Sequence, residues 1–140
     1  GISFTVTGTD ETGTSATESI TGADTGTATG SSYFATVTAI TAVGDPAGNV
    51  SAGSGTSIAA PMYRGRMRLR GIYVVNTGTA GTTTFSQTSS SGAVAMKFNT
   101  VASANTTQYP DIPDDGILFA AGGYVLYTQT ALSSITVFYS

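Results

Sequence analysis

The sequence predicts an all-β protein, an antiparallel β-sandwich or jelly roll with no substantial helix. Short segments alternate β-branched or aromatic residues with polar ones, and clusters of Gly, Asp and Ser separate these segments. No window of about ten residues is free of the Gly, Thr and Val that penalise helices. Many short strands divided by turns are typical of sandwiches and jelly rolls, which protect their sheet edges without helices.

Nine segments carry the strand pattern. In chain order they are residues 2–7, 15–21, 33–42, 66–75, 82–87, 93–100, 116–120, 124–129 and 134–139. In the last segment Ile135 and Val137 alternate with Thr136 and Phe138, so we expect it to complete a sheet.

The chain divides by composition into three parts. Residues 1–45 form a Thr-rich acidic β module, residues 46–61 a flexible seam rich in Gly, Ala and Ser, and residues 62–140 a β-sandwich module. The first module is too small to bury much surface alone, so we expect it to lean on its neighbour or on another subunit. The two modules could equally form one continuous domain.

Charge is scarce in this sequence. Charged residues make up 9% of the chain, against roughly 25% in an ordinary soluble domain. Such a surface repels other copies only weakly, which favours a homo-oligomer. No run approaches the roughly 20 apolar residues of a membrane helix, so no membrane is expected as a partner. No signal-peptide pattern opens the chain, and Gly1 fits either removal of an initiator Met or trimming of a longer precursor.

The sequence offers little catalytic chemistry. It contains no His and no Cys, so an imidazole base, a thiolate nucleophile and a zinc site of the usual kind are excluded. Two pairs of adjacent acids occur, Asp10 with Glu11 and Asp114 with Asp115. Neighbours in an extended chain point to opposite sides, so we interpret both pairs as turn acids. No loop has the ligand spacing of a calcium site. The sequence therefore predicts no enzyme, no metal and no cofactor.

Charge is also segregated along the chain. The charged residues in 1–45 are all acidic, and the charged residues in 46–110 are all basic. Four of the five basic residues stand at alternate positions: Arg64, Arg66, Arg68 and Arg70. Alternate residues of a strand share a face and lie about 6.6 to 7 Å apart, so this spacing predicts a line of guanidinium groups. The other face of the strand, with Met67 and Leu69, should be core.

Three interpretations of the arginines compete. They could form a solvated face, pair with acids of the same chain or of an adjoining subunit, or bind nucleic acid. Pairing is favoured because arginine suits bidentate contacts with carboxylates. Nucleic acid is disfavoured by the sequence pI near 4.4 and by the lack of interleaved aromatic residues. The predicted interface residues are Arg64, Arg66, Arg68, Arg70, Asp111, Asp114 and Asp115.

Two stretches resemble modules of tailed-bacteriophage structural proteins. One comprises "RMRLRGIYVVNTGTAGTTTF", "YPDIPDDGILFAAGGYVLYT" and "SSITVFYS", and the other is the Thr-rich opening "ISFTVTGTDETGTSATESITGADTGTATGSSYFATVTAITAVG". The resemblance implies a virion component such as a capsid decoration, head fibre or tail accessory protein. Its partners would be copies of itself and other virion proteins, and no enzymatic residue carries over.

A secreted or cell-surface β-sandwich that binds glycan or forms a filament is the alternative. Glycan binding usually requires an exposed aromatic platform beside polar groups, and the chain has no Trp. Eight of its aromatic residues stand in strand patterns or beside Pro, where we expect core packing: Tyr33, Phe34, Tyr73, Tyr109, Tyr124, Tyr127, Phe138 and Tyr139.

Overall fold

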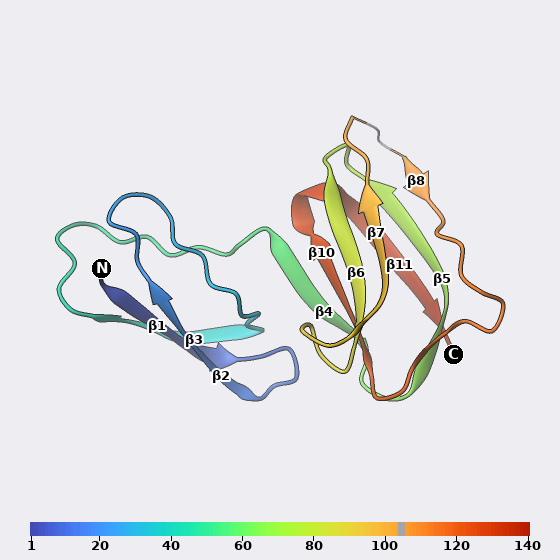
Figure 1. The fold of residues 1–140 in the computed structure, drawn as a ribbon, viewed down its shortest axis with the longest axis horizontal. Helices are drawn as coiled ribbons and strands as arrows, with labels where there is room; N and C mark the ends of the chain where they lie inside the picture. The colour runs from blue at the N-terminus through green and yellow to red at the C-terminus, as the bar shows by residue number, and fades with distance from the viewer. Residues whose placement is uncertain (104–105) are drawn as a thin grey trace. The chain divides into compact units, whose positions relative to one another are not determined.

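The computed structural model describes residues 1–103 and 106–140, and the chain divides into two compact units, unit 1 (Gly1–Gly55) and unit 2 (Thr56–Ser140) (Figure 1). Antiparallel strands build both units, and the described residues contain a single helix, the three-residue 3-10 turn η1 (Gln129–Ala131). The predicted all-β class is confirmed. None of the described segments is a helix long and apolar enough to cross a membrane.

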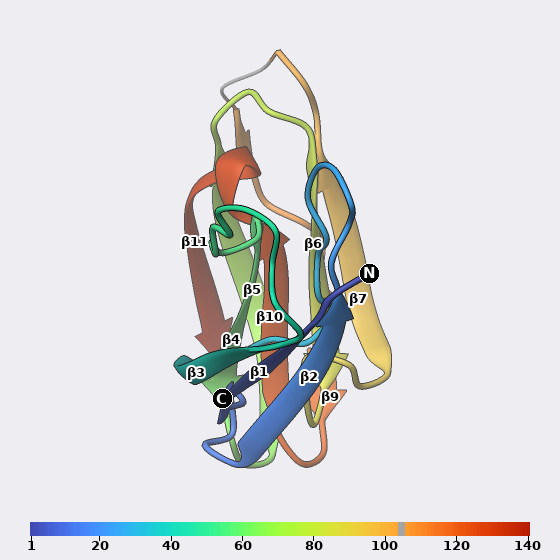
Figure 2. The ribbon, with the colours of Figure 1, turned by 90° about the vertical axis from the view of Figure 1, so that its left-hand side faces the viewer.

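Unit 1 is a three-stranded antiparallel sheet. Its central strand is β1 (Ser3–Thr9), which pairs with β2 (Ser15–Thr21) on one side and with β3 (Thr36–Val43) on the other, as Figure 2 shows. Both β2 and β3 are therefore edge strands, each with one row of backbone N–H and C=O groups that the sheet does not use.

The turn between β1 and β2 is organised by Asp10. One oxygen of its carboxylate, Oδ1, accepts hydrogen bonds from the backbone N–H groups of Thr12 at 2.8 Å and Thr14 at 3.0 Å. The backbone N–H of Gly13 donates to the carbonyl oxygen of Asp10 at 3.0 Å. Gly13 has a φ of 86°, a left-handed conformation that glycine adopts without steric cost. The expected turn role of Asp10 is thus borne out.

The two faces of the unit 1 sheet differ in chemistry. Directly opposed residues of antiparallel strands share a face, and successive residues alternate between faces. The register therefore gives one face a set of hydroxyl side chains: Ser3, Thr5, Thr7, Thr9, Ser15, Thr17, Ser19 and Thr21. The opposite face carries apolar side chains: Phe4, Val6, Ile20, Val37 and Ile40. The segment between β2 and β3 covers part of this apolar face, since Gly30 lies against Glu18 and Ile20.

Unit 2 is a sandwich of two four-stranded antiparallel sheets. One has the strand order β4-β10-β6-β7 and the other the order β11-β5-β8, with β9 also paired to β5. The strands are β4 (Ser57–Tyr63), β5 (Met67–Asn76), β6 (Gly81–Gln87), β7 (Val94–Thr100), β8 (Thr107–Gln108), β9 (Ile117–Phe119), β10 (Gly123–Thr128) and β11 (Leu132–Tyr139).

Both sheets of unit 2 supply its core. From the sheet of β5, β9 and β11 come Met67, Leu69, Ile72, Val74, Phe119 and Leu132, and from the other sheet come Phe85 and Val125. Met67 and Leu69 are 2% and 0% exposed, which confirms that this side of the arginine strand is core. Burying an apolar side chain of this size contributes about 1.5 to 3 kcal/mol.

Some boundaries differ from those predicted. Residues 57–61, assigned to the flexible seam, belong to β4, and the division between the two units falls just before them. The strand β4 was not predicted, because Pro61 and its small neighbours resemble a loop. A proline has no N–H for the sheet and is tolerated at an edge, and β4 is the edge strand of its sheet. The third strand was expected from Tyr33 but begins at Thr36.

Candidate interaction surfaces

The four arginines do not share one strand, contrary to prediction. Arg64 and Arg66 precede β5, in the short connection that follows β4, and only Arg68 and Arg70 lie on the strand. The connection includes Gly65 and carries the chain from one sheet of the sandwich to the other. The alternating pattern of arginines therefore begins in the connection before β5, and only its last two members lie on the strand.

Arg70 occupies a β-bulge. Tyr139 of β11 lies opposite Leu69, and Phe138 lies opposite Gly71, so Arg70 is an extra residue on β5. A bulge bends its strand and redirects the side chains around it. The buried positions accordingly shift from 67 and 69 before the bulge to 72, 74 and 76 after it.

Arg68 and Arg70 hold a turn of the same chain. Arg68 Nη1 donates to the carbonyl oxygen of Asp115 at 2.8 Å, and Arg70 Nη1 donates to that of Asp114 at 2.9 Å. Arg70 Nε also donates to Ser140 Oγ at 3.1 Å. The turn itself is closed by a hydrogen bond of 2.7 Å from the Gly116 N–H to the Pro113 carbonyl oxygen. The two guanidinium groups thus fasten the acidic turn to β5.

The structure brings only part of the predicted interface together. Arg68 and Arg70 meet the turn at Asp114 and Asp115, but they bind its backbone oxygens, whereas the expected acceptors were carboxylates. The side chain of Asp111 is exposed, and no hydrogen bond joins it to these two arginines. A contact between subunits at these residues stays a prediction, because the structure contains one chain.

Three aromatic residues expected in the core lie at the surface instead. Tyr109 is 71% exposed, Phe138 56% and Tyr139 49%. The expectation was right for Tyr124, which is 3% exposed. Tyr139 stacks on Tyr63 of β4, with ring centroids 5.7 Å apart. Strand alternation identified two faces for β11 but not which of them the second sheet would cover.

The β3 strand of unit 1 is the most exposed strand of the chain as far as it is described. All eight of its residues are exposed, including Val37 at 53%, Ile40 at 49% and Val43 at 64%. It contains no charged residue and no proline. Charged side chains and prolines are what proteins ordinarily use to block an edge strand. Their absence from β3 was not among the features predicted from the sequence.

Two acidic side chains of unit 1, Asp10 and Glu18, hold loops of the same unit. Glu18 Oε1 accepts hydrogen bonds from the Ser31 backbone N–H at 2.6 Å and from Ser31 Oγ at 2.9 Å, and its Oε2 accepts one from the Ser32 N–H at 3.2 Å. The Ser31 N–H, as the largest cause, holds the pKa of Glu18 below its ordinary value, because it stabilises the charged form. The Thr12 hydroxyl likewise lowers the pKa of Asp10.

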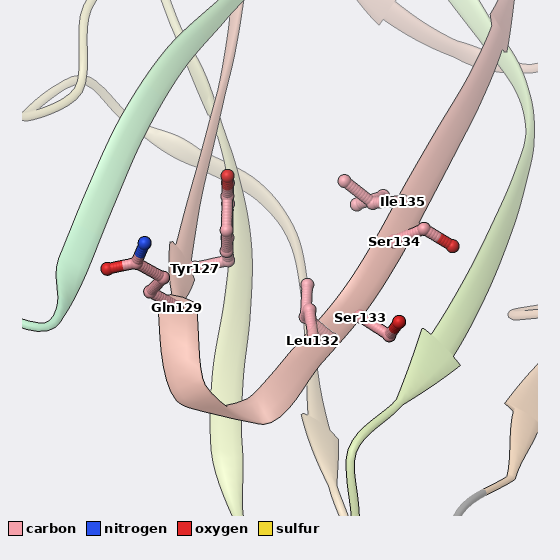
Figure 3. A pocket seen from close by; sticks show the side chains of 6 residues that line it. All are labelled: Tyr127, Gln129, Leu132, Ser133, Ser134 and Ile135. Atoms are coloured by element: carbon pink, nitrogen blue, oxygen red, sulfur yellow. The ribbon is translucent and has the colours of Figure 1, made fainter.

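Two openings flank the sandwich of unit 2. One, of about 250 Å³, lies where β10 turns into β11 and is lined by Tyr127, Gln129, Leu132, Ser133, Ser134 and Ile135 (Figure 3). In that view Leu132 and Ile135 point to the side of β11 where Tyr127 lies, and the hydroxyls of Ser133 and Ser134 point away. The other, of about 330 Å³, is lined by Phe98, Asn99, Gln108, Tyr109 and Pro110.

Across residues 1–103 and 106–140, no three acidic side chains gather into a group that could hold a metal ion. The openings are lined by aromatic, amide, hydroxyl and aliphatic side chains without a charged one. Comparison with protein-family profiles, with curated protein sequences and with solved structures gives no match for this chain.

Proposed function

We propose that the protein is a non-enzymatic structural subunit of a tailed-phage virion, working by assembly, and that a second copy joins it at the open edge of β3. The observation that carries the assembly proposal is the exposure of the whole of β3. The virion setting is supported by the resemblance of the arginine-rich and Thr-rich stretches to structural modules of tailed phages.

The edge of β3 is suited to strand pairing. In the sheet order β2-β1-β3, no described strand pairs with its outer side, so alternate N–H and C=O groups there have no partner strand. A strand from another chain can satisfy these groups by extending the sheet. Since β3 itself carries no charged side chain, two copies of it would bring no like charges of the strand face to face.

A two-fold axis through Ile40 gives the simplest pairing. Two copies of β3 running antiparallel would place Ile40 beside its symmetry mate, and each three-stranded sheet would continue into the other. The pair would bury side chains that are half exposed in one chain. Burial of apolar surface would then supply stability that unit 1 lacks, since Val6 is its only buried hydrophobic side chain among the described residues.

Sedimentation of a charged edge variant tests the assembly proposal. Ile40→Lys introduces a charge at the centre of β3, and Val50→Lys makes the same change in charge outside any strand, at a residue of similar exposure, 55% against 49%. We expect wild type and Val50→Lys to sediment as oligomers and Ile40→Lys to sediment with the 14.0 kDa mass of one chain. Circular dichroism should be the same for all three.

Two results would contradict the proposal. A wild-type protein that stays monomeric at about 100 μM, some tenfold above a Kd in the ordinary range for a structural contact, would exclude self-assembly. An Ile40→Lys variant that sediments like wild type would place the contact elsewhere. The virion setting has its own test, which is mass spectrometry of purified tailed-phage particles from the source of the sequence.

A further inference from the structure

The groove beside β7 and β8 in unit 2 has the composition of a ligand site. It lies on the open side of the sandwich, between β7, the edge strand of one sheet, and β8, the edge of the other. In Figure 1 the last part of β7 lies at the same end of the unit as β8. The lining consists of two aromatic rings, two amides and one proline: Phe98, Tyr109, Asn99, Gln108 and Pro110.

Both aromatic rings are held in place by other rings. Phe98 packs on the buried Phe85, with centroids 6.2 Å apart. Tyr109 is 71% exposed yet contacts Tyr73 of β5, with centroids 5.0 Å apart. Tyr109 lies between Gln108, the last residue of β8, and Pro110, whose ring fixes its own φ. An exposed ring that is already positioned loses little conformational entropy when a ligand covers it.

The two amides of the lining differ in where they point. Asn99 follows Phe98 on β7, so its side chain points to the opposite face of the strand, where its Oδ1 accepts a hydrogen bond from Thr82 Oγ1 at 3.1 Å. The backbone of Gln108 is tied into β8 opposite Val74, but its half-buried side chain makes no hydrogen bond within the described residues. Gln108, next to Tyr109 in the chain, thus has donors and an acceptor that no described residue uses.

The chemistry of the lining selects the class of ligand. No charged side chain lines the groove, so an ionic ligand would leave water without a compensating charge. A sugar ring is neutral, has an apolar C–H face for an aromatic ring, and carries vicinal hydroxyls that match the donors and acceptors of an amide. We propose that this groove binds a neutral sugar residue of a glycan, with Tyr109 as the stacking platform and Gln108 as the hydroxyl contact.

Binding of neutral oligosaccharides tests this site. The probes are maltohexaose, cellohexaose, chitohexaose and mannotriose, added to the ¹⁵N-labelled full chain at up to about 20 mM, a range that detects the weak millimolar Kd of a shallow site. We expect at least one of them to shift the side-chain amide signals of Gln108 in a saturable way. Tyr109→Ala should weaken that binding at least tenfold.

Tyr139→Ala is the matched control, because Tyr139 is likewise an exposed tyrosine stacked on a second ring, but away from the groove. It should bind as wild type does. Gln108→Ala, which leaves every aromatic contact in place, should also weaken binding, so the outcome does not depend on one variant. Assembly through β3 uses different residues, and Ile40→Lys should bind the sugar normally whether or not it remains oligomeric.

Three outcomes would overturn the assignment. The first is the absence of any saturable shift with all four sugars. The second is equal loss of binding in Tyr109→Ala and Tyr139→Ala, which would indicate a general aromatic effect. The third is a shift of the same amides on raising the protein concentration alone, which would make the groove a contact between copies of this chain.

Discussion

The two units of this chain are built from similar strands, but unit 2 encloses a core and unit 1 is a single sheet. Unit 2 closes two sheets over a core that includes Leu69, Val74, Phe85 and Phe119, all 0% exposed. Unit 1 has one sheet, and Val6 is its single buried hydrophobic side chain in the described structure. Strand pairing alone therefore does not produce an interior, because a sheet needs a second layer to exclude water from one of its faces.

The difference indicates where each unit obtains its stability. In unit 2 the burial of apolar side chains within the chain is the main favourable contribution. In unit 1 the backbone ladder and the loop contacts of Asp10 and Glu18 add to the partial burial of its apolar side chains. The physical reason for expecting a partner at β3 is its open edge, whose outer backbone groups pair with no described strand.

The largest effect is expected from a cavity in unit 2. Phe85→Ala removes a ring that is 0% exposed and should lower the free energy of unfolding by about 3 to 5 kcal/mol. The comparison variant in unit 1 is Val43→Ala, which removes methyl groups from a residue that is 64% exposed. It should change the free energy of unfolding by less than about 0.5 kcal/mol. Urea unfolding, followed by circular dichroism, measures both. Similar losses for the two variants would remove the contrast between the units.

An intermediate effect is expected at the turn that Arg68 and Arg70 hold. Gly116 has a φ of 71°, and a Cβ there would lie 2.6 Å from the Leu69 carbonyl oxygen. Gly116→Ala should therefore destabilise unit 2 by about 1 to 3 kcal/mol. Gly53→Ala is the control, since a Cβ at Gly53 meets nothing within 4 Å. Thermal melts compare the two, and equal melting temperatures would mean that the turn is not packed as described.

The smallest effect is expected in unit 1 when the pH is lowered. The pKa of Glu18 is lowered in the folded chain, so its hydrogen bonds to Ser31 stabilise unit 1 above the ordinary pKa of 4.5 and are lost as the pH falls through the folded-state pKa below it. The Ser31 amide signal in NMR should shift across that window. Glu18→Gln should abolish the shift, and Asp45→Asn, at an exposed acid after β3, should not. A shift that persists in Glu18→Gln would assign the titration to another group.

Strand periodicity was enough to predict the fold class and most of the strands. The β2 segment was predicted to the residue, the prediction for β7 differs from the structure by one residue at its start, and that for β5 by one residue at each end. Met67 and Leu69 were identified as core because alternation with arginine leaves one face apolar. Strand positions and the buried face of a strand depend on residues close together in the sequence, so the alternation of apolar and polar residues predicts them.

The remaining features depend on contacts between distant parts of the chain. The exposure of Tyr109 depends on where β8 ends relative to β5, and residues 73 and 109 are brought together only by the fold. The acceptors of Arg68 and Arg70 are backbone oxygens, which every residue has, so composition could not point to them. The bulge at Arg70 likewise appears only when β11 pairs with β5.

The contact between the arginines and the turn leaves its acidic side chains free to vary in evolution. Arg68 and Arg70 recognise main-chain oxygens at positions 115 and 114, and both aspartate side chains at these positions are exposed. A substitution there changes the surface charge without removing an acceptor, provided that the turn keeps its shape. The chain can therefore diversify these two positions toward a new neighbour while its arginines continue to hold the same loop.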